Sequence, residues 1–207
     1  MISRVAQPVS ILYVAILAAG MVLGLDADAL FPRETQGPAP LPVLPFVVIG
    51  QAIFFLLVWP VALSTRQQES HPIREVGLCF LLTVPFLIVA AFLSNATVAD
   101  VLRSQVAVLT LIPLSWVAGS LLRRPPWRSG LLLGLLAITL LLPALCYCVL
   151  DFLDAPLAVT LFRAAPVTFV YTAAASNGEW SSNPLWAWTH WVLLAGLLWL
   201  IGSRTKR

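Results

Sequence analysis

The stretch LPVLPFVVIGQAIFFLLVWPVAL, residues 41–63, decides the fold class of this chain. None of its residues is charged, and Gln51 is the only strongly polar one. About 20 predominantly apolar residues are what a helix needs to cross a hydrocarbon core roughly 30 Å thick. The apolar residues run on without the polar alternation that is typical of strands in membrane barrels. The stretch therefore predicts a membrane-spanning helix.

Five further stretches have the same character. They predict spans at residues 8–25, 76–93, 105–122, 129–152 and 185–201. The composition agrees, because 60% of the residues are hydrophobic, only 10% are charged and the mean hydropathy is +0.93. A soluble domain carries about 25% charged residues, which it needs to cover a surface that faces water. We therefore predict an all-α, polytopic membrane helix bundle, with residues 1–207 forming a single transmembrane domain of six helices.

The basic residues predict the orientation of these six spans. If the N-terminus lies inside, nine of the 12 Lys and Arg residues fall on the inner side. Only Arg33, Arg103 and Arg163 then fall outside. Because positive residues accumulate on the cytoplasmic side of membrane proteins, both termini are expected in the cytoplasm. The net charge of +3 then reflects topology, and no nucleic-acid partner is expected.

A seventh apolar stretch, residues 155–175, does not fit a simple span. Arg163 lies near its middle, and Pro156 and Pro166 interrupt it. An arginine at the centre of a spanning helix costs about 2.5–3.5 kcal/mol on insertion scales, and proline breaks or kinks a helix. We therefore predict a broken re-entrant or surface segment between spans five and six, made of two short helices near the outer surface. Arg163 would pair with an outer carboxylate or with lipid phosphate.

Small and polar residues within the spans suggest internal contacts. Small residues four apart let helices approach closely in lipid, so two such pairs are predicted to serve helix packing within the chain or between two copies. These pairs are Gly20 with Gly24 and Gly130 with Gly134. Polar groups at membrane depth usually face protein or a water-filled cavity, so Gln51 is predicted to line an internal translocation path. Asp100 and Arg103 are three residues apart and are expected to pair on a helical turn.

Motifs for catalysis and for metal binding are missing from the sequence. The three cysteines and two histidines form no CxxC or HExxH pattern, and there is no GxSxG or P-loop. We therefore expect no enzymatic activity, no cofactor and no metal. Any ATP hydrolysis associated with this chain must come from a partner.

The layout resembles the membrane permease subunit of an ABC-2 type exporter. Three features carry the resemblance: the basic turn LLRRPPWR at residues 121–128 after span four, the split segment within 151–184, and a last span entered through SNPL at 182–185. The resemblance implies six spans, a re-entrant segment before the last one, a second permease copy or homologue, and a separate cytoplasmic ATPase as the source of energy. In that family the loop between spans two and three contacts the ATPase, which implies a contact through Arg66, His71, Arg74 and Glu75.

A second interpretation remains open beside the exporter. The chain can equally be a non-catalytic scaffold or accessory subunit of a larger membrane complex, since small size and few buried charges suit that role as well. Arginine strongly outnumbers lysine, which occurs only once, and this usage fits a bacterial inner membrane. The substrate does not follow from the sequence under either interpretation.

The predicted orientation is testable by cysteine labelling from outside the cell. In a background with Cys79, Cys146 and Cys148 replaced by alanine, a membrane-impermeant maleimide should label the Glu34→Cys variant, because residue 34 falls in an outer loop. The Arg128→Cys variant should stay unlabelled until the membrane is permeabilised. The opposite pattern would show that the orientation with the N-terminus inside is wrong.

Overall fold

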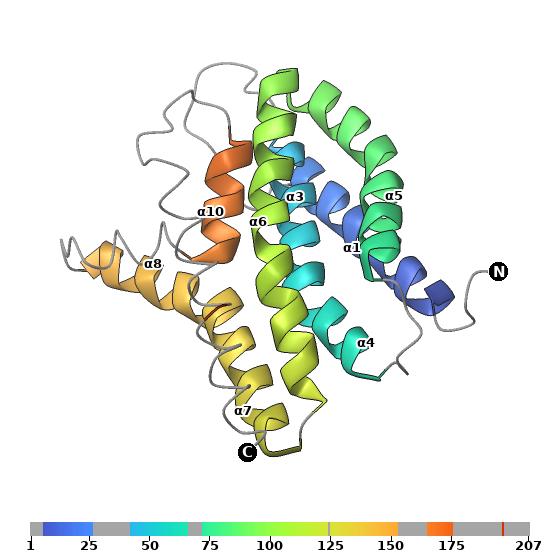
Figure 1. Ribbon diagram of the computed structural model, residues 1–207. Coiled ribbons are helices and arrows are strands. Elements are labelled where there is room, and N and C mark those ends of the chain that lie inside the picture. Colours follow the sequence, from blue (N-terminus) through green and yellow to red (C-terminus); the bar gives the residue numbers. More distant parts are fainter. Residues whose placement is uncertain are drawn as a thin grey trace.

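The computed structural model describes residues 6–26, 42–65, 72–123, 125–152, 165–175 and Gly196, and within these ranges it contains helices and no strands (Figure 1). In chain order the elements are α1 (Ala6–Leu25), α3 (Val43–Ile53), the π-helix η1 (Phe54–Val58), α4 (Trp59–Thr65), α5 (Pro72–Leu93), α6 (Val98–Leu122), α7 (Pro125–Leu136), the π-helix η2 (Ala137–Leu141), α8 (Leu142–Phe152) and α10 (Pro166–Ala174).

Within the described residues, five helical stretches are long and apolar enough to cross a membrane. They are Pro8–Leu25, Val43–Thr65, Ile73–Leu93, Val98–Leu122 and Arg128–Cys146. Each overlaps one of the first five predicted spans, and the chain is a helical membrane protein. The sixth predicted span, residues 185–201, lies outside the described residues apart from Gly196.

The fourth span starts earlier than the sequence predicted. α6 begins at Val98 rather than near Gln105, and it runs for 25 residues. The reason is a capping box, in which the Thr97 side chain accepts from the Asp100 N–H while the Asp100 carboxylate accepts from the Thr97 N–H. This exchange satisfies two N–H groups at the helix start, which would otherwise lack partners. Asp100 and Arg103 therefore belong to the helix itself.

Two spans are interrupted by a π-helical turn that ends just before a proline. Proline has no N–H, and its ring clashes with the carbonyl group four residues earlier, so a wider turn accommodates it better than an α-turn does. In Figure 1 the chain changes direction between α7 and α8, where one of these turns lies. The closing N–H bonds are Trp59 to Phe54 before Pro60, and Leu142 to Ala137 before Pro143.

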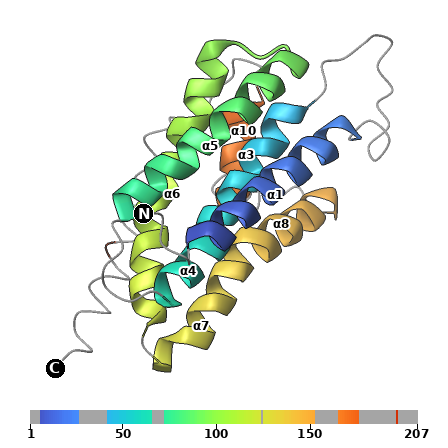
Figure 2. The same cartoon turned by 90° about the vertical axis from the view of Figure 1, so that its right-hand side faces the viewer.

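The α3–α4 stretch and α6 are the most buried spans, and α1 lies along α3 (Figure 2). Two glycines allow this close approach. A Cβ added at Gly20 would lie 2.7 Å from the Phe46 carbonyl oxygen, and one added at Gly24 would lie 2.6 Å from the Val43 Cα. Because these neighbours are backbone atoms, they cannot move aside as a flexible side chain would. The first GxxxG pair therefore lies at a helix crossing within the chain.

The second GxxxG pair is placed differently. Within the part of the chain that the structure describes, a Cβ added at Gly130 or Gly134 meets nothing within 4 Å. A third glycine, which the sequence prediction did not single out, has a close neighbour instead. At Gly119 of α6 an added Cβ would lie 2.9 Å from the Leu63 Cβ and 3.2 Å from the Pro60 carbonyl oxygen. Gly119 thus marks the crossing of α6 and α4.

α10 is a short helix within the bundle. It starts at Pro166, directly after Ala165 in an extended conformation, and has nine residues. At about 1.5 Å per residue such a helix covers roughly 14 Å, about half of the hydrocarbon core. Its buried face packs against α3 and α6 (Figure 1). Arg163 and the rest of residues 153–164 lie outside the described residues.

The α1–α3 crossing predicts that alanine substitutions at two glycines have different effects on stability. Gly24→Ala should lower the free energy of unfolding by about 1–3 kcal/mol, because the added methyl group overpacks a backbone contact. Gly134→Ala is the matched control and should cause no loss, since alanine has the higher helix propensity and space is open there. Unfolding in mixed micelles measures both variants. Equal stability of the two would contradict this account of the crossing.

Candidate functional site: a buried polar cluster

Four polar side chains from four different spans meet inside the bundle, and we call them the polar cluster. They are Tyr13 of α1, Gln51 of α3, Thr83 of α5 and Gln105 of α6. Tyr13, Gln51 and Thr83 are fully buried, and Gln105 is half-buried. Gln51 and Gln105 lie about two turns, or roughly 10–12 Å, from the starts of their helices. The cluster therefore lies well inside the membrane-spanning region.

The two glutamines form a reciprocal amide pair. The Gln105 Nε2 donates to the Gln51 Oε1 at 2.9 Å, and the Gln51 Nε2 donates to the Gln105 Oε1 at 3.2 Å. Each amide thus gives a proton to the carbonyl oxygen of the other, which joins α3 to α6. Side-chain hydrogen bonds between membrane helices stabilise their association by about 0.6–1.7 kcal/mol.

The hydroxyl groups continue this pair into a directed chain. Thr83 has one hydroxyl proton, and its Oγ1 lies 2.7 Å from the Cys79 carbonyl oxygen, to which it donates. The Tyr13 hydroxyl must then donate across the 2.5 Å contact to the Thr83 Oγ1. The Gln51 Nε2 lies 3.2 Å from the Tyr13 hydroxyl oxygen and completes the chain by donating to it. The protons therefore point from the glutamine pair toward α5.

An aromatic shell lies beside this chain. The ring centroids of Tyr13 and Phe54 are 4.4 Å apart, and Phe55 contacts Tyr13, Phe54, Trp59 and Phe80. Tilted and edge-on aromatic pairs of this kind fill space efficiently and exclude water. The polar cluster has no charged member, so its chemistry is hydrogen bonding between neutral groups. It can hold helices together or bind a neutral polar group, but it has no acid–base pair for catalysis.

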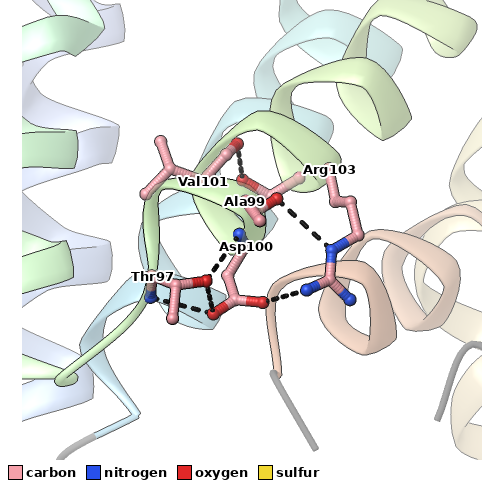
Figure 3. A network of polar contacts seen from close by, with 6 residues as sticks. Thr97, Ala99, Asp100, Val101 and Arg103 are labelled. Carbon is pink, nitrogen blue, oxygen red and sulfur yellow. Dashed lines mark hydrogen bonds and ion pairs between the residues drawn. The ribbon is translucent and has the colours of Figure 1, made fainter. Parts of the chain in front are cut away.

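A second polar group lies at the start of α6 (Figure 3). The buried Asp100 carboxylate accepts from the Thr97 N–H at 2.9 Å and from the Thr97 hydroxyl at 2.6 Å. It also accepts from the Arg103 Nη2 at 2.5 Å, while the Arg103 Nε donates to the Ala99 carbonyl oxygen. The expected Asp100–Arg103 pair is thus present. Its members compensate one another's charge at the helix N-terminus, where a carboxylate is favoured.

Two of the four residues predicted to contact an ATPase, Arg74 and Glu75, fall at the start of α5. Arg74 is exposed and Glu75 is half-buried in the first helical turn. Arg66 and His71 lie outside the described residues. Close to this end of the bundle, the Arg123 guanidinium donates to the Leu63 carbonyl oxygen through Nη2 at 2.9 Å and Nε at 3.3 Å. This contact joins the end of α6 to the end of α4.

Two members of the polar cluster were not predicted as site residues. Tyr13 and Thr83 each stand within a long apolar stretch, and that isolation is the signal that could have identified them. Tyrosine is common at membrane interfaces and threonine commonly bonds to its own helix, so neither residue indicates a cluster by itself. Their convergence on Gln51 depends on how α1 and α5 pack.

Among the residues that the structure describes, no group of three or more His, Cys, Asp or Glu side chains is placed to hold a metal ion. A scan against protein-family models, a search of curated proteins and a search of solved structures gave no match to this chain.

The glutamine pair predicts a measurable coupling between α3 and α6. Gln51→Leu should lower the free energy of unfolding by about 1–3 kcal/mol, because it leaves the half-buried Gln105 amide without its partner. Adding Gln105→Leu should recover part of that loss. Ser104→Ala is the control, since the Ser104 hydroxyl donates to the Val101 carbonyl oxygen of its own helix and, among the described residues, to no other helix. Strictly additive losses in a double-mutant cycle would show that the two amides do not stabilise each other.

Proposed function

We propose that this chain is the membrane permease subunit of an exporter similar to the ABC-2 class, driven by a separate cytoplasmic ATPase. In this proposal it has six spans with both termini in the cytoplasm of a bacterial cell. It works beside a second copy or a homologue and catalyses no reaction itself.

The observation that carries the proposal is α10. This nine-residue helix follows the fifth span, starts at a proline after an extended residue, and packs against the two most buried spans. A helix of half the membrane thickness is tolerated at such a place because it is covered by protein. Broken helices of this kind are typical of transport proteins, where they form or border the path of a substrate.

The polar cluster has a defined place in this proposal. In this proposal the described arrangement, in which Gln51 is fully buried and hydrogen-bonded, is the closed one. A path that passes Gln51 opens only if α3 and α6 separate and the amide pair breaks. The amides then become available to a passing polar group, which replaces the lost hydrogen bonds. The cluster thereby serves as a neutral gate within the subunit.

A scaffold or accessory subunit is the second candidate, and one observation favours it. The members of the polar cluster satisfy one another, and polar residues at membrane depth often act as such internal glue. A scaffold needs this rigidity and no gate. The two candidates therefore differ in whether the amide pair ever opens and in whether an ATPase binds the chain.

The experiment that tests the proposal is purification of the tagged chain from its native membranes in mild detergent, followed by mass spectrometry. We expect a protein with a P-loop to copurify in stoichiometric amount, and its ATP hydrolysis to rise at least about twofold in the complex. Arg74→Glu should lower its recovery severalfold, because it reverses a charge at the proposed contact. Arg74→Lys, which keeps the positive charge at the same exposed position, is the matched control.

Recovery of a stable complex that contains other membrane proteins and no P-loop protein would overturn the permease proposal in favour of the scaffold. Equal recovery of the ATPase with wild type and with Arg74→Glu would show that the contact lies elsewhere than at the start of α5.

A further inference from the structure

α4 is attached to the rest of its span through a weakened point. The π-helix η1 ends where the Trp59 N–H donates to the Phe54 carbonyl oxygen, and Pro60 then offers no N–H at all. The regular ladder of hydrogen bonds between residues four apart is therefore interrupted between α3 and α4. Kinks and π-turns of this kind are places where a helix bends and where functional hinges are found.

At this point the described arrangement leaves one buried hydrogen-bond donor, on Trp59, without an acceptor. Its side chain is 1% exposed, and its indole Nε1 has no hydrogen-bond partner among the described residues. A buried N–H without an acceptor carries an energetic penalty, and such groups are rare in folded proteins. An arrangement that gives this N–H a partner can therefore compete with the present one.

The far end of α4 is held by a contact at the surface. The exposed Arg123 donates two hydrogen bonds to the Leu63 carbonyl oxygen, one of the last carbonyl groups of α4, which have no partner within the helix. Gly119 lets α6 approach Leu63 and Pro60 closely at the same place. Because Arg123 is charged and exposed, a carboxylate of a partner protein can draw it away from Leu63.

We propose that α4, Trp59–Thr65, is a hinged segment that turns about η1 and that Arg123 is its latch. In the described arrangement the latch is closed, and the ends of α4 and α6 lie together. Release of Arg123 lets α4 swing away from α6 and opens the bundle toward Gln51, about two turns or roughly 12 Å further along the same span. The direction of this opening rests on the proposed permease function, in which an ATPase acts at this end.

Spin-label distances test the hinge without a substrate or an ATPase. The full chain, with Cys79, Cys146 and Cys148 replaced by alanine, carries nitroxides at Thr65→Cys and Ser120→Cys, two exposed positions at the ends of α4 and α6. In lipid nanodiscs the latched chain should give one dominant short distance. Arg123→Gln should add a second population longer by about 5 Å or more, the rise of one helical turn. Arg128→Gln, which changes an exposed arginine on α7, should leave the distribution as it was.

A second substitution separates a hinge from simple fraying of the last turn. Pro60→Ala restores the missing N–H, so in the Arg123→Gln background it should reduce the longer population at least twofold. Fraying beyond Leu63 would persist in that double variant and would overturn the hinge at η1. An Arg123→Gln distribution that matches wild type would overturn the latch. Either result leaves the permease proposal to its own test, because the distances require no ATPase.

Discussion

Hydrocarbon offers no hydrogen-bond partner, so a polar group within this bundle carries an energetic penalty unless it finds a partner inside the protein. The helices meet that demand for the backbone. Several hydroxyl groups meet it locally, since Ser104, Thr110 and Ser115 all donate to carbonyl oxygens of their own helix. A glutamine amide has two N–H donors and a carbonyl acceptor, and its own helix does not satisfy all of them. Gln51 therefore forms hydrogen bonds to side chains of three other helices. The arrangement of α1, α3, α5 and α6 depends on these bonds.

The prolines within the spans affect the hydrogen bonds of the backbone, because proline has no N–H. Pro85 and Pro113 lie inside helices α5 and α6, which remain α-helical. Pro60 and Pro143 instead follow π-turns, and the unpartnered buried atoms Trp59 Nε1 and Thr139 Oγ1 lie at or within these turns. The two interrupted spans thus combine a missing backbone donor with a polar side chain that lacks a partner. At such places a membrane helix bends at the lowest energetic cost.

The two proposed roles of the chain share this physical basis. A cluster of neutral hydrogen bonds stabilises a scaffold while it stays closed, and it serves a permease if it can open. Charge would make either role harder, since an unpaired charge at membrane depth is costly. The buried Asp100 carboxylate accordingly lies at the start of α6, paired with Arg103 and the capping N–H, and the polar cluster deeper in the bundle is neutral. What separates the two roles is whether α3 and α6 move apart at the amide pair and whether an ATPase binds the chain.

The sequence by itself determined the fold class and the approximate position of the first five spans, because the length and continuity of an apolar run follow directly from the thickness of the bilayer. It also indicated Gln51 and the Asp100–Arg103 pair, since polar residues stand out against such runs. It placed the start of α6 near Gln105 instead of Val98, because hydropathy counts Asp100 and Arg103 as charged residues and takes no account of their pairing. Only the tertiary structure decided that Tyr13 and Thr83 join Gln51, and that Gly20 and Gly24 rather than Gly130 and Gly134 lie at a crossing among the described helices. These outcomes depend on which face each helix turns to its neighbours, and in a span that is apolar all round the sequence carries little information about that face.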